Sequence, residues 1–283
     1  MVIVLPNDIM IKAVNYIIEN LSEDLSVDEI AEHCHFSKFY FNRLFKSVIG
    51  ESVYSFIKRL RIEKSALQIG IEHNKTITEI GNSYGYSSSN FSTAFKKHYG
   101  KSPYEFKSIR QNNKIRKNKD FYVDLSKTSY EHFNKEIKLV YLTDTRVVYQ
   151  RYIGHYHNLG QYWAEFCDSH RQYIDETSVY YEISYDDPIL TDPDRCITDI
   201  AISTSKPPAR DCLTMVIKGG KYMAYTYAGP NTRIFEAFQG LLGVWLPNSN
   251  YVADLKKRKV VVKYNSIDVA SNLFSLDIYI PIV

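Results

Sequence analysis

The segment that follows Ser37 carries side chains able to read base pairs in duplex DNA. Its apolar residues recur at i, i+3, i+4 and i+7, as expected of one buried face of a helix. The opposite stripe has the same spacing. It holds an arginine, which can clasp guanine, an asparagine, which can pair with adenine, and an aromatic ring, which can rest on a thymine methyl. We therefore predict a DNA-reading helix with the exposed stripe Phe39, Asn42, Arg43 and Lys46, and with Ser37 and Lys38 at its start.

A second copy of this segment lies 50 residues further along the chain. Residues 26–56 match residues 76–106 in unbroken register, so that Phe41 is equivalent to Phe91 and Phe45 to Phe95. The equivalent stripe is short and mostly neutral, which favours contacts to phosphates and weak contacts to bases. We predict that it consists of Ser89, Ser92, Thr93, Lys96 and Lys97.

Local signals predict the helices that position these two stripes. Each copy opens with a hydroxyl residue three positions before a glutamate, the spacing of a capping box. A short helix is expected from there to about residue 33 or 83, then a turn and the reading helix. Residues 53–69 form a long connecting helix, and an apolar pattern from Met10 to Leu21 predicts a packing helix in front. Two such helix-turn-helix units would set their reading helices about 34 Å apart, one turn of the duplex.

Charge divides the chain in the same way. The 283 residues carry a net charge of +3, and their length is that of about two ordinary domains. Residues 1–119 hold 18 basic and 12 acidic residues, a net +6, which leaves −3 for the remainder. Only the first part is therefore expected to face a polyanion. Residues 108–119 are polar and basic with almost no apolar content, as is typical of a linker.

From residue 147 onward the pattern changes to short strands with only two helical stretches, near residues 159–169 and 232–242. A faint repeat relates Asp199-Ile200-Ala201-Ile202 to Asp277-Ile278-Tyr279-Ile280, and each member follows one of the helices. We predict two βαββ units in one α+β domain. Its aromatic residues can wall an apolar ligand pocket and offer faces to a cation. This predicted set is Tyr149, Trp163, Tyr225, Tyr227, Trp245 and Tyr264, with Val262 beside it.

The first part resembles the AraC/XylS family of bacterial transcription regulators over about residues 8–107. The resemblance rests on Ile80-Gly81, Gly85-Tyr86, Phe91, Phe95-Lys96, Gly100-x-Ser102-Pro103 and Phe106 at the family's spacing. It implies promoter DNA and RNA polymerase as partners, with Phe39, Asn42 and Arg43 at base-contacting positions. Thr93 stands where relatives often carry arginine, so the resemblance implies weaker base reading by the second copy.

The second part resembles the GyrI-like effector-binding domain of Rob-like regulators over about residues 124–283. The motifs are Gly154-x-Tyr156 before a helix with Trp163, Gly219-Gly220-Lys221-Tyr222, Trp245-Leu246-Pro247, Tyr264 and the closing Asp277-Ile278-Tyr279-Ile280-Pro281. This resemblance implies a small-molecule effector, often cationic. Relatives commonly carry a buried glutamate two residues before the equivalent of Tyr264, where this chain has Val262. The expected effector is therefore neutral and apolar or aromatic, unless Glu182 or Asp186 points inward.

Together these observations predict a multidomain protein: an all-α double helix-turn-helix domain at 1–107, a linker at 108–123, and an α+β domain of two βαββ units at 124–283. The predicted function is effector-controlled transcription regulation, without catalytic residues. Two alternatives are a small-molecule hydrolase with accessory DNA binding and a second domain that only binds other proteins. His155, His157, Cys167 and His170 have no metal-ligand spacing, so we expect no metal or cofactor. The dispersed cysteines and the absence of a signal or membrane segment favour the cytoplasm.

Overall fold

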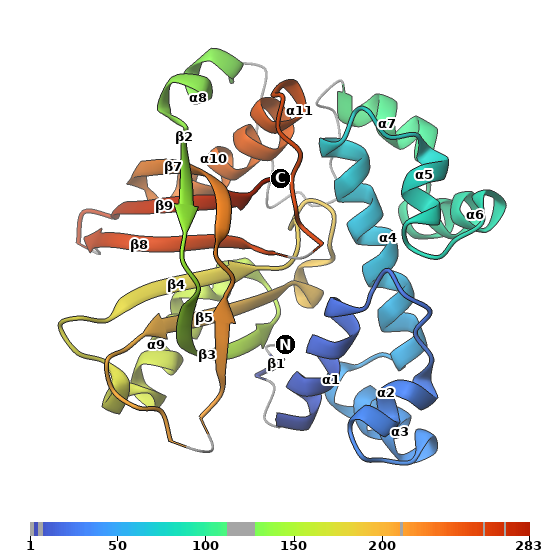
Figure 1. The fold of residues 1–283 in the computed structure, drawn as a ribbon, viewed down its shortest axis with the longest axis horizontal. Helices are drawn as coiled ribbons and strands as arrows, with labels where there is room; N and C mark the ends of the chain where they lie inside the picture. Colours follow the sequence, from blue (N-terminus) through green and yellow to red (C-terminus); the bar gives the residue numbers. More distant parts are fainter. Residues whose placement is uncertain (1–2, 5–7, 112–127, 210–211, 257, 269) are drawn as a thin grey trace. The chain divides into compact units, whose positions relative to one another are not determined.

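The computed structural model describes residues 3–4, 8–111, 128–209, 212–256, 258–268 and 270–283. It divides into two compact units, one drawn from Leu5–Lys117 and the other from Met1–Val4 with Asn118–Val283. Figure 1 shows the helical elements of the first unit and the large sheet of the second. We describe each unit by itself.

The first unit consists of helices arranged as the repeat predicts. Both helix-turn-helix units are present, and the long connecting helix is two residues longer than expected. The α-helices are α1 (Asp8–Glu19), α2 (Val27–His33), α3 (Lys38–Ile49), α4 (Val53–Ile71), α5 (Ile77–Asn82), α6 (Ser88–Tyr99) and α7 (Pro103–Gln111).

The two copies pack their aromatic residues in the same way. Phe45 of α3 meets Phe56 of α4 edge to face, with ring centroids 5.3 Å apart. In the second copy Phe95 of α6 meets Phe106 of α7 edge to face at 5.1 Å. All four side chains are buried. The repeat in the sequence is therefore a repeat of core packing.

The helix starts follow the prediction only in part. Thr76 and Glu79 form the full capping box at α5, each satisfying the backbone N–H of the other. At α2 the Ser26 hydroxyl accepts from the Glu29 N–H, but the Glu29 carboxylate accepts from the Tyr16 hydroxyl of α1 instead. The predicted box at α2 is thus half formed, because a neighbouring helix offers its carboxylate another donor.

The second unit is an antiparallel sheet with helices packed on it. Nine strands are described in the order β1-β3-β5-β4-β8-β9-β7-β2, with β6 beside β3. The strands are β1 (Ile3–Val4), β2 (Lys138–Leu142), β3 (Thr145–Ile153), β4 (Val179–Ser184), β5 (Ile197–Ser203), β6 (Thr214–Ile217), β7 (Gly220–Pro230), β8 (Val260–Asp268) and β9 (Leu273–Pro281). The α-helices are α8 (Tyr130–Glu136), α9 (Leu159–Ser169), α10 (Ile234–Gly240) and α11 (Leu246–Asn248).

The order of the strands confirms the two predicted βαββ units. One is β3-α9-β4-β5 and the other is β7-α10-β8-β9, and their strands appear as mirror-ordered halves, β3-β5-β4 and β8-β9-β7. The halves join where β4 pairs with β8, side by side in Figure 1. At this junction Glu182 of β4 lies directly opposite Val262 of β8.

The predicted linker and the described helices overlap. Helix α7 continues to Gln111, four residues into the segment 108–123 that we predict as linker. Residues 112–127 lie outside the described part, so the two domain boundaries remain predictions. Among the described helices, none combines the length and the apolar character needed to cross a bilayer.

Candidate nucleic-acid interface and effector site

Most of the predicted stripe of α3 is exposed to solvent, and Asn42 is half-buried. Phe39 is 82% exposed, although it is a large apolar residue, and Arg43 and Lys46 are exposed beside it. Neither basic side chain has a hydrogen-bond or ion-pair partner among the described residues. Their donors are therefore available to an external acceptor, and the exposed ring of Phe39 has no ring partner among the described residues of its unit.

Asn42 has a second role that its spacing does not reveal. Its side-chain oxygen accepts a hydrogen bond of 3.3 Å from the backbone N–H of Val53, the first residue of α4. A two-point contact to adenine needs this same oxygen as the acceptor. Asn42 thus ties the reading helix to the connecting helix, and its amide N–H₂ group is what remains for a base.

The start of α3 is also partly engaged within the protein. Ser37 is the N-cap residue, but its hydroxyl makes no capping hydrogen bond. Lys38 forms an ion pair of 2.5 Å with Asp28 of α2, and both side chains are exposed. An exposed pair of this kind contributes little to stability, so Lys38 can exchange this partner for a phosphate at small cost.

The predicted stripe of the second copy lies on α6 and is mostly exposed. Ser89, Thr93, Lys96 and Lys97 of α6 are exposed and Ser92 is half-buried. The Thr93 hydroxyl donates to the backbone oxygen of Ser89, whereas Lys96 and Lys97 make no hydrogen bond or close ion pair with the described residues, and Lys96 interacts with Glu105 only through its charge. The free donors of α6 are thus mainly its two lysines.

In the second unit, the structure gathers most of the predicted aromatic set on one face of the sheet. Strand register puts Tyr225, Val262, Tyr227 and Tyr264 on the same face, and α9 packs Trp163 against it. Tyr149 points to the opposite face, where its ring lies near the Arg151 guanidinium. Trp245 donates to Asn134 of α8 and stacks on Tyr251. Tyr149 therefore cannot share a pocket with Tyr264.

A buried carboxylate occupies the junction of the two halves. Glu182 of β4 is only 5% exposed and stands directly opposite Val262 of β8. The Tyr264 hydroxyl donates to its Oε2 at 3.0 Å, and the Ser184 hydroxyl lies 3.3 Å from its Oε1. The expected absence of a carboxylate depended on Glu182 and Asp186 lying elsewhere, and Glu182 meets the exception: the neighbouring strand supplies the acid that Val262 does not. Asp186 instead accepts from the backbone N–H of Ile197.

Three aromatic rings lie beside this carboxylate. The Trp163 ring meets Tyr264 edge to face at 5.3 Å and Tyr180 at 5.9 Å. The indole N–H lies close enough to the Tyr264 hydroxyl to lower its pKa, but not in hydrogen-bond geometry. All three rings are half-buried, so the cluster reaches the surface. The sequence prediction missed Tyr180, although its position two residues before Glu182 on an alternating strand is a usable signal.

Burial sets the protonation of this cluster. Loss of hydration raises the pKa of Glu182 to about 7, while hydrogen bonds from Tyr264 and Ser184 act in the opposite direction. Burial and the adjacent carboxylate raise the pKa of Tyr264 well above its usual value. At neutral pH the Glu182 carboxyl is thus poised between its neutral and charged forms, and Tyr264 remains a hydrogen-bond donor.

Comparisons with known proteins match both units. A family model for the GyrI-like small molecule binding domain covers residues 135–283, which include Glu182 and the aromatic cluster. The chain belongs to this family. A helix-turn-helix domain model covers residues 30–109, in agreement with the helix-turn-helix units predicted for the first part.

Relatives of this GyrI-like protein include named regulators. The transcriptional regulator Rob of Salmonella typhimurium is 23% identical over 248 residues, which are 82% of each chain. The Tn10 TetD protein of Escherichia coli is 37% identical over 82 residues, 29% of this chain and 59% of that protein. The C-terminal domain of AraT, a response regulator from Geobacillus stearothermophilus, is 32% identical, with a TM-score of 0.35, over 36% of this chain and 86% of that domain.

Proposed function

We propose that this protein is a transcription regulator that binds promoter DNA through α3 and α6 and responds to a small molecule held at Glu182. The DNA-binding proposal depends on one observation above all. The exposed stripe of α3 combines an aromatic ring that is 82% exposed, Phe39, with two basic side chains that have no partner among the residues that the structure describes. Selection of duplexes from a random-sequence library by the full-length protein tests it, because an enriched sequence is expected.

The effector proposal depends on the carboxylate at the junction of the two halves. A buried carboxylate stabilises a cation that enters beside it, and aromatic faces add a further attraction. Tyr264 bonds to Glu182, and Trp163 packs on Tyr264 and on Tyr180 of the same strand as Glu182, so both elements are present. The favoured effector is therefore an aromatic or lipophilic cation. This replaces the neutral ligand that Val262 alone would favour.

A matched pair of ring systems tests the charge preference. Calorimetric titration of the full-length protein uses N-methylquinolinium as the cation and 1-methylnaphthalene as a neutral compound of similar shape. At pH 8 the wild type should bind the cation more tightly, and Glu182→Gln should abolish the difference. Glu176→Gln, which changes an exposed carboxylate of the same domain, should keep it. Tighter wild-type binding of the neutral compound would contradict the proposal.

The same titration has a pH signature. Binding of the cation needs the charged form of Glu182, whose pKa is about 7. Affinity for the cation should fall about tenfold from pH 8 to pH 6 in the wild type, because most of the carboxyl is then protonated. Glu182→Gln should show no such change, and a wild-type affinity independent of pH would count against Glu182 as the binding group.

Hydrolysis of a small substrate is a second candidate function, and Glu182 is the observation that favours it. A carboxyl with a pKa near neutrality next to a tyrosine hydroxyl can serve as a general base. We rank it second because relatives such as Rob are named as transcriptional regulators. Release of p-nitrophenol from aryl esters by the wild type, lost in Glu182→Gln, would reverse this order.

Contact with RNA polymerase at the promoter is a further part of the regulatory proposal.

A further inference from the structure

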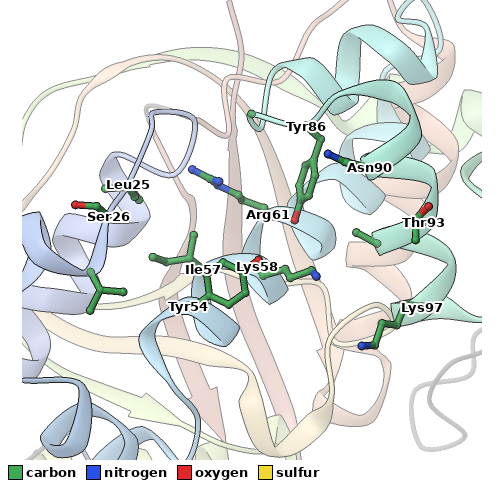
Figure 2. Close-up of a pocket in the computed structure, with 13 residues that line it drawn as sticks. Leu25, Ser26, Tyr54, Ile57, Lys58, Arg61, Tyr86, Asn90, Thr93 and Lys97 are labelled. Carbon is green, nitrogen blue, oxygen red and sulfur yellow. The ribbon is translucent and has the colours of Figure 1, made fainter. Parts of the chain in front are cut away.

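A groove of about 500 Å³ lies in the first unit beside the connecting helix α4. Two walls of the groove are faces of α4 and α6, and the lining residues are spaced in the same way along both helices (Figure 2). Helix α4 contributes residues at i, i+3, i+4 and i+7, and α6 does the same. The α4 residues are Tyr54, Ile57, Lys58 and Arg61, and the α6 residues are Asn90, Thr93, Ala94 and Lys97.

The groove is cationic. Lys58, Arg61 and Lys97 line it, and none of its described lining residues is acidic. Arg61 is partly engaged, since its Nε donates to the backbone oxygen of Leu21 at 3.0 Å. Lys58 and Lys97 have no partner among the described residues, and Figure 2 shows Lys58 extending from α4 toward the side of the groove that carries Thr93 and Lys97. Two unpaired ammonium groups on facing walls form a site for a chain of negative charges.

Uncharged donors complete the lining. Tyr54 is 66% exposed although it is a large aromatic residue, and its phenol lies on the same face of α4 as Lys58. Asn90 stands opposite on α6 with its amide N–H₂ group, whereas the Thr93 hydroxyl already donates to the backbone oxygen of Ser89. Hydroxyl, amide and ammonium donors together are the groups that hold phosphate and sugar oxygens in protein–DNA interfaces.

We propose that this groove holds the sugar–phosphate backbone of the DNA strand that borders the major-groove segment entered by α6. The proposal rests on the proposed DNA binding and extends it from the two reading helices to the helix between them. Thr93 belongs both to the predicted reading stripe and to the groove, so a duplex engaged by α6 brings its backbone to this side. Helix α4 is then a DNA-contacting element through Lys58 and Tyr54, and not only a connector.

Salt dependence tests the groove. The full-length protein and a 30-base-pair duplex obtained by library selection are titrated between 50 and 200 mM NaCl. Lys58→Ala should weaken binding to selected and random duplexes alike and reduce the slope of log Kd against log salt by about 0.9. Over this salt range the variant should therefore lose about threefold less affinity than the wild type. Lys12→Ala, at an exposed lysine of α1 outside the groove, is the control and should keep the wild-type slope.

Phosphate ethylation locates the contact. Ethyl groups on one or two phosphates beside the α6 half-site should block the wild type and have no further effect on Lys58→Ala. A wild-type slope in Lys58→Ala, or an unchanged ethylation pattern, overturns the groove as a backbone site. Inorganic phosphate that binds the wild type but not Lys58→Ala, and that leaves DNA binding unchanged at constant ionic strength, would instead identify a site for small anions and also overturn it. If the wild type selects no sequence at all, the proposed function fails rather than the groove.

Discussion

Arg151 of β3 and Asp199 of β5 form a two-point ion pair within the sheet of the GyrI-like domain. The Nε–Oδ1 and Nη2–Oδ2 distances are both 2.7 Å, and neither side chain is exposed. The Tyr185 hydroxyl donates to the same carboxylate at 2.7 Å. This pair lies on the face opposite Glu182, so the sheet buries acids on both faces, one paired with a cation and one without a cationic partner in the described part.

Asp199→Ala should lower the free energy of unfolding of this domain by about 3 to 5 kcal/mol, because it leaves the Arg151 charge buried and unpaired. Urea unfolding followed by tryptophan fluorescence measures it, since both tryptophans, Trp163 and Trp245, lie in this domain. Asp168→Ala removes the partner of exposed Arg171 and serves as the control, with a change below about 1 kcal/mol. Equal effects of the two substitutions would show that the buried ion pair contributes no more to the free energy of unfolding than the exposed one.

Glu182 should make the stability of the domain depend on pH. Its pKa is about 7 in the folded chain and 4.5 ordinarily, so between these values the folded state keeps a proton that the unfolded state has released. Stability must then fall as pH rises, by on the order of 3 kcal/mol between pH 5 and pH 8. Glu182→Gln should lack this part of the decline in urea unfolding, whereas Glu176→Gln should follow the wild type. Parallel curves for wild type and Glu182→Gln would mean that Glu182 ionises normally.

Arg43→Ala and Lys96→Ala should weaken DNA binding in different ways. Loss of the arginine should cost about 1 to 3 kcal/mol and relax the preference at one base pair, because a base contact is lost. Loss of the lysine should weaken all sequences alike. Competition among duplexes substituted one base pair at a time distinguishes these outcomes, and an intact preference in Arg43→Ala would remove Arg43 from the reading stripe.

Gly81→Ala should destabilise the first unit by about 1 to 3 kcal/mol through overpacking. A methyl group at this position would lie 2.8 Å from Cγ of Phe91, whose ring is buried in the second copy. Thermal unfolding followed by circular dichroism measures the loss. Asn82→Ala, at the exposed neighbour in the same helix, should change stability by less than about 0.5 kcal/mol. A neutral Gly81→Ala would mean that Phe91 can shift without cost.

Local signals explain why the helices of the first unit were predictable. Caps, turns and apolar spacing act within a few residues, and the 50-residue repeat doubled each signal. The predicted helix 159–169 of the second unit also matches α9. Strand β2 and helix α8 were missed, as their short segments carry little periodicity.

Register across strands explains what the sequence could not specify. Glu182 and Val262 are 80 residues apart, and only the pairing of β4 with β8 puts them opposite each other. The sequence indicated an apolar residue where relatives carry an acid and offered Glu182 and Asp186 as replacements, but it could not specify which of the two lies beside Val262. Asn42 shows the same limit, because its bond to Val53 depends on how two helices meet.

The pairing of β1 with β3 has a consequence for how the chain folds during synthesis. Ile3 pairs with Ile153 and Val4 with Tyr152, so this strand is made about 150 residues before its partner. The helical segments α1–α7 all emerge in that interval, and their contacts are mostly local. The middle of the sheet is completed later in synthesis, because β4 pairs with β8 at 260–268 and β7 pairs with β9 at 273–281. Long-range pairing forms slowly, so the helical unit can be complete on the ribosome while β1 still lacks a neighbour.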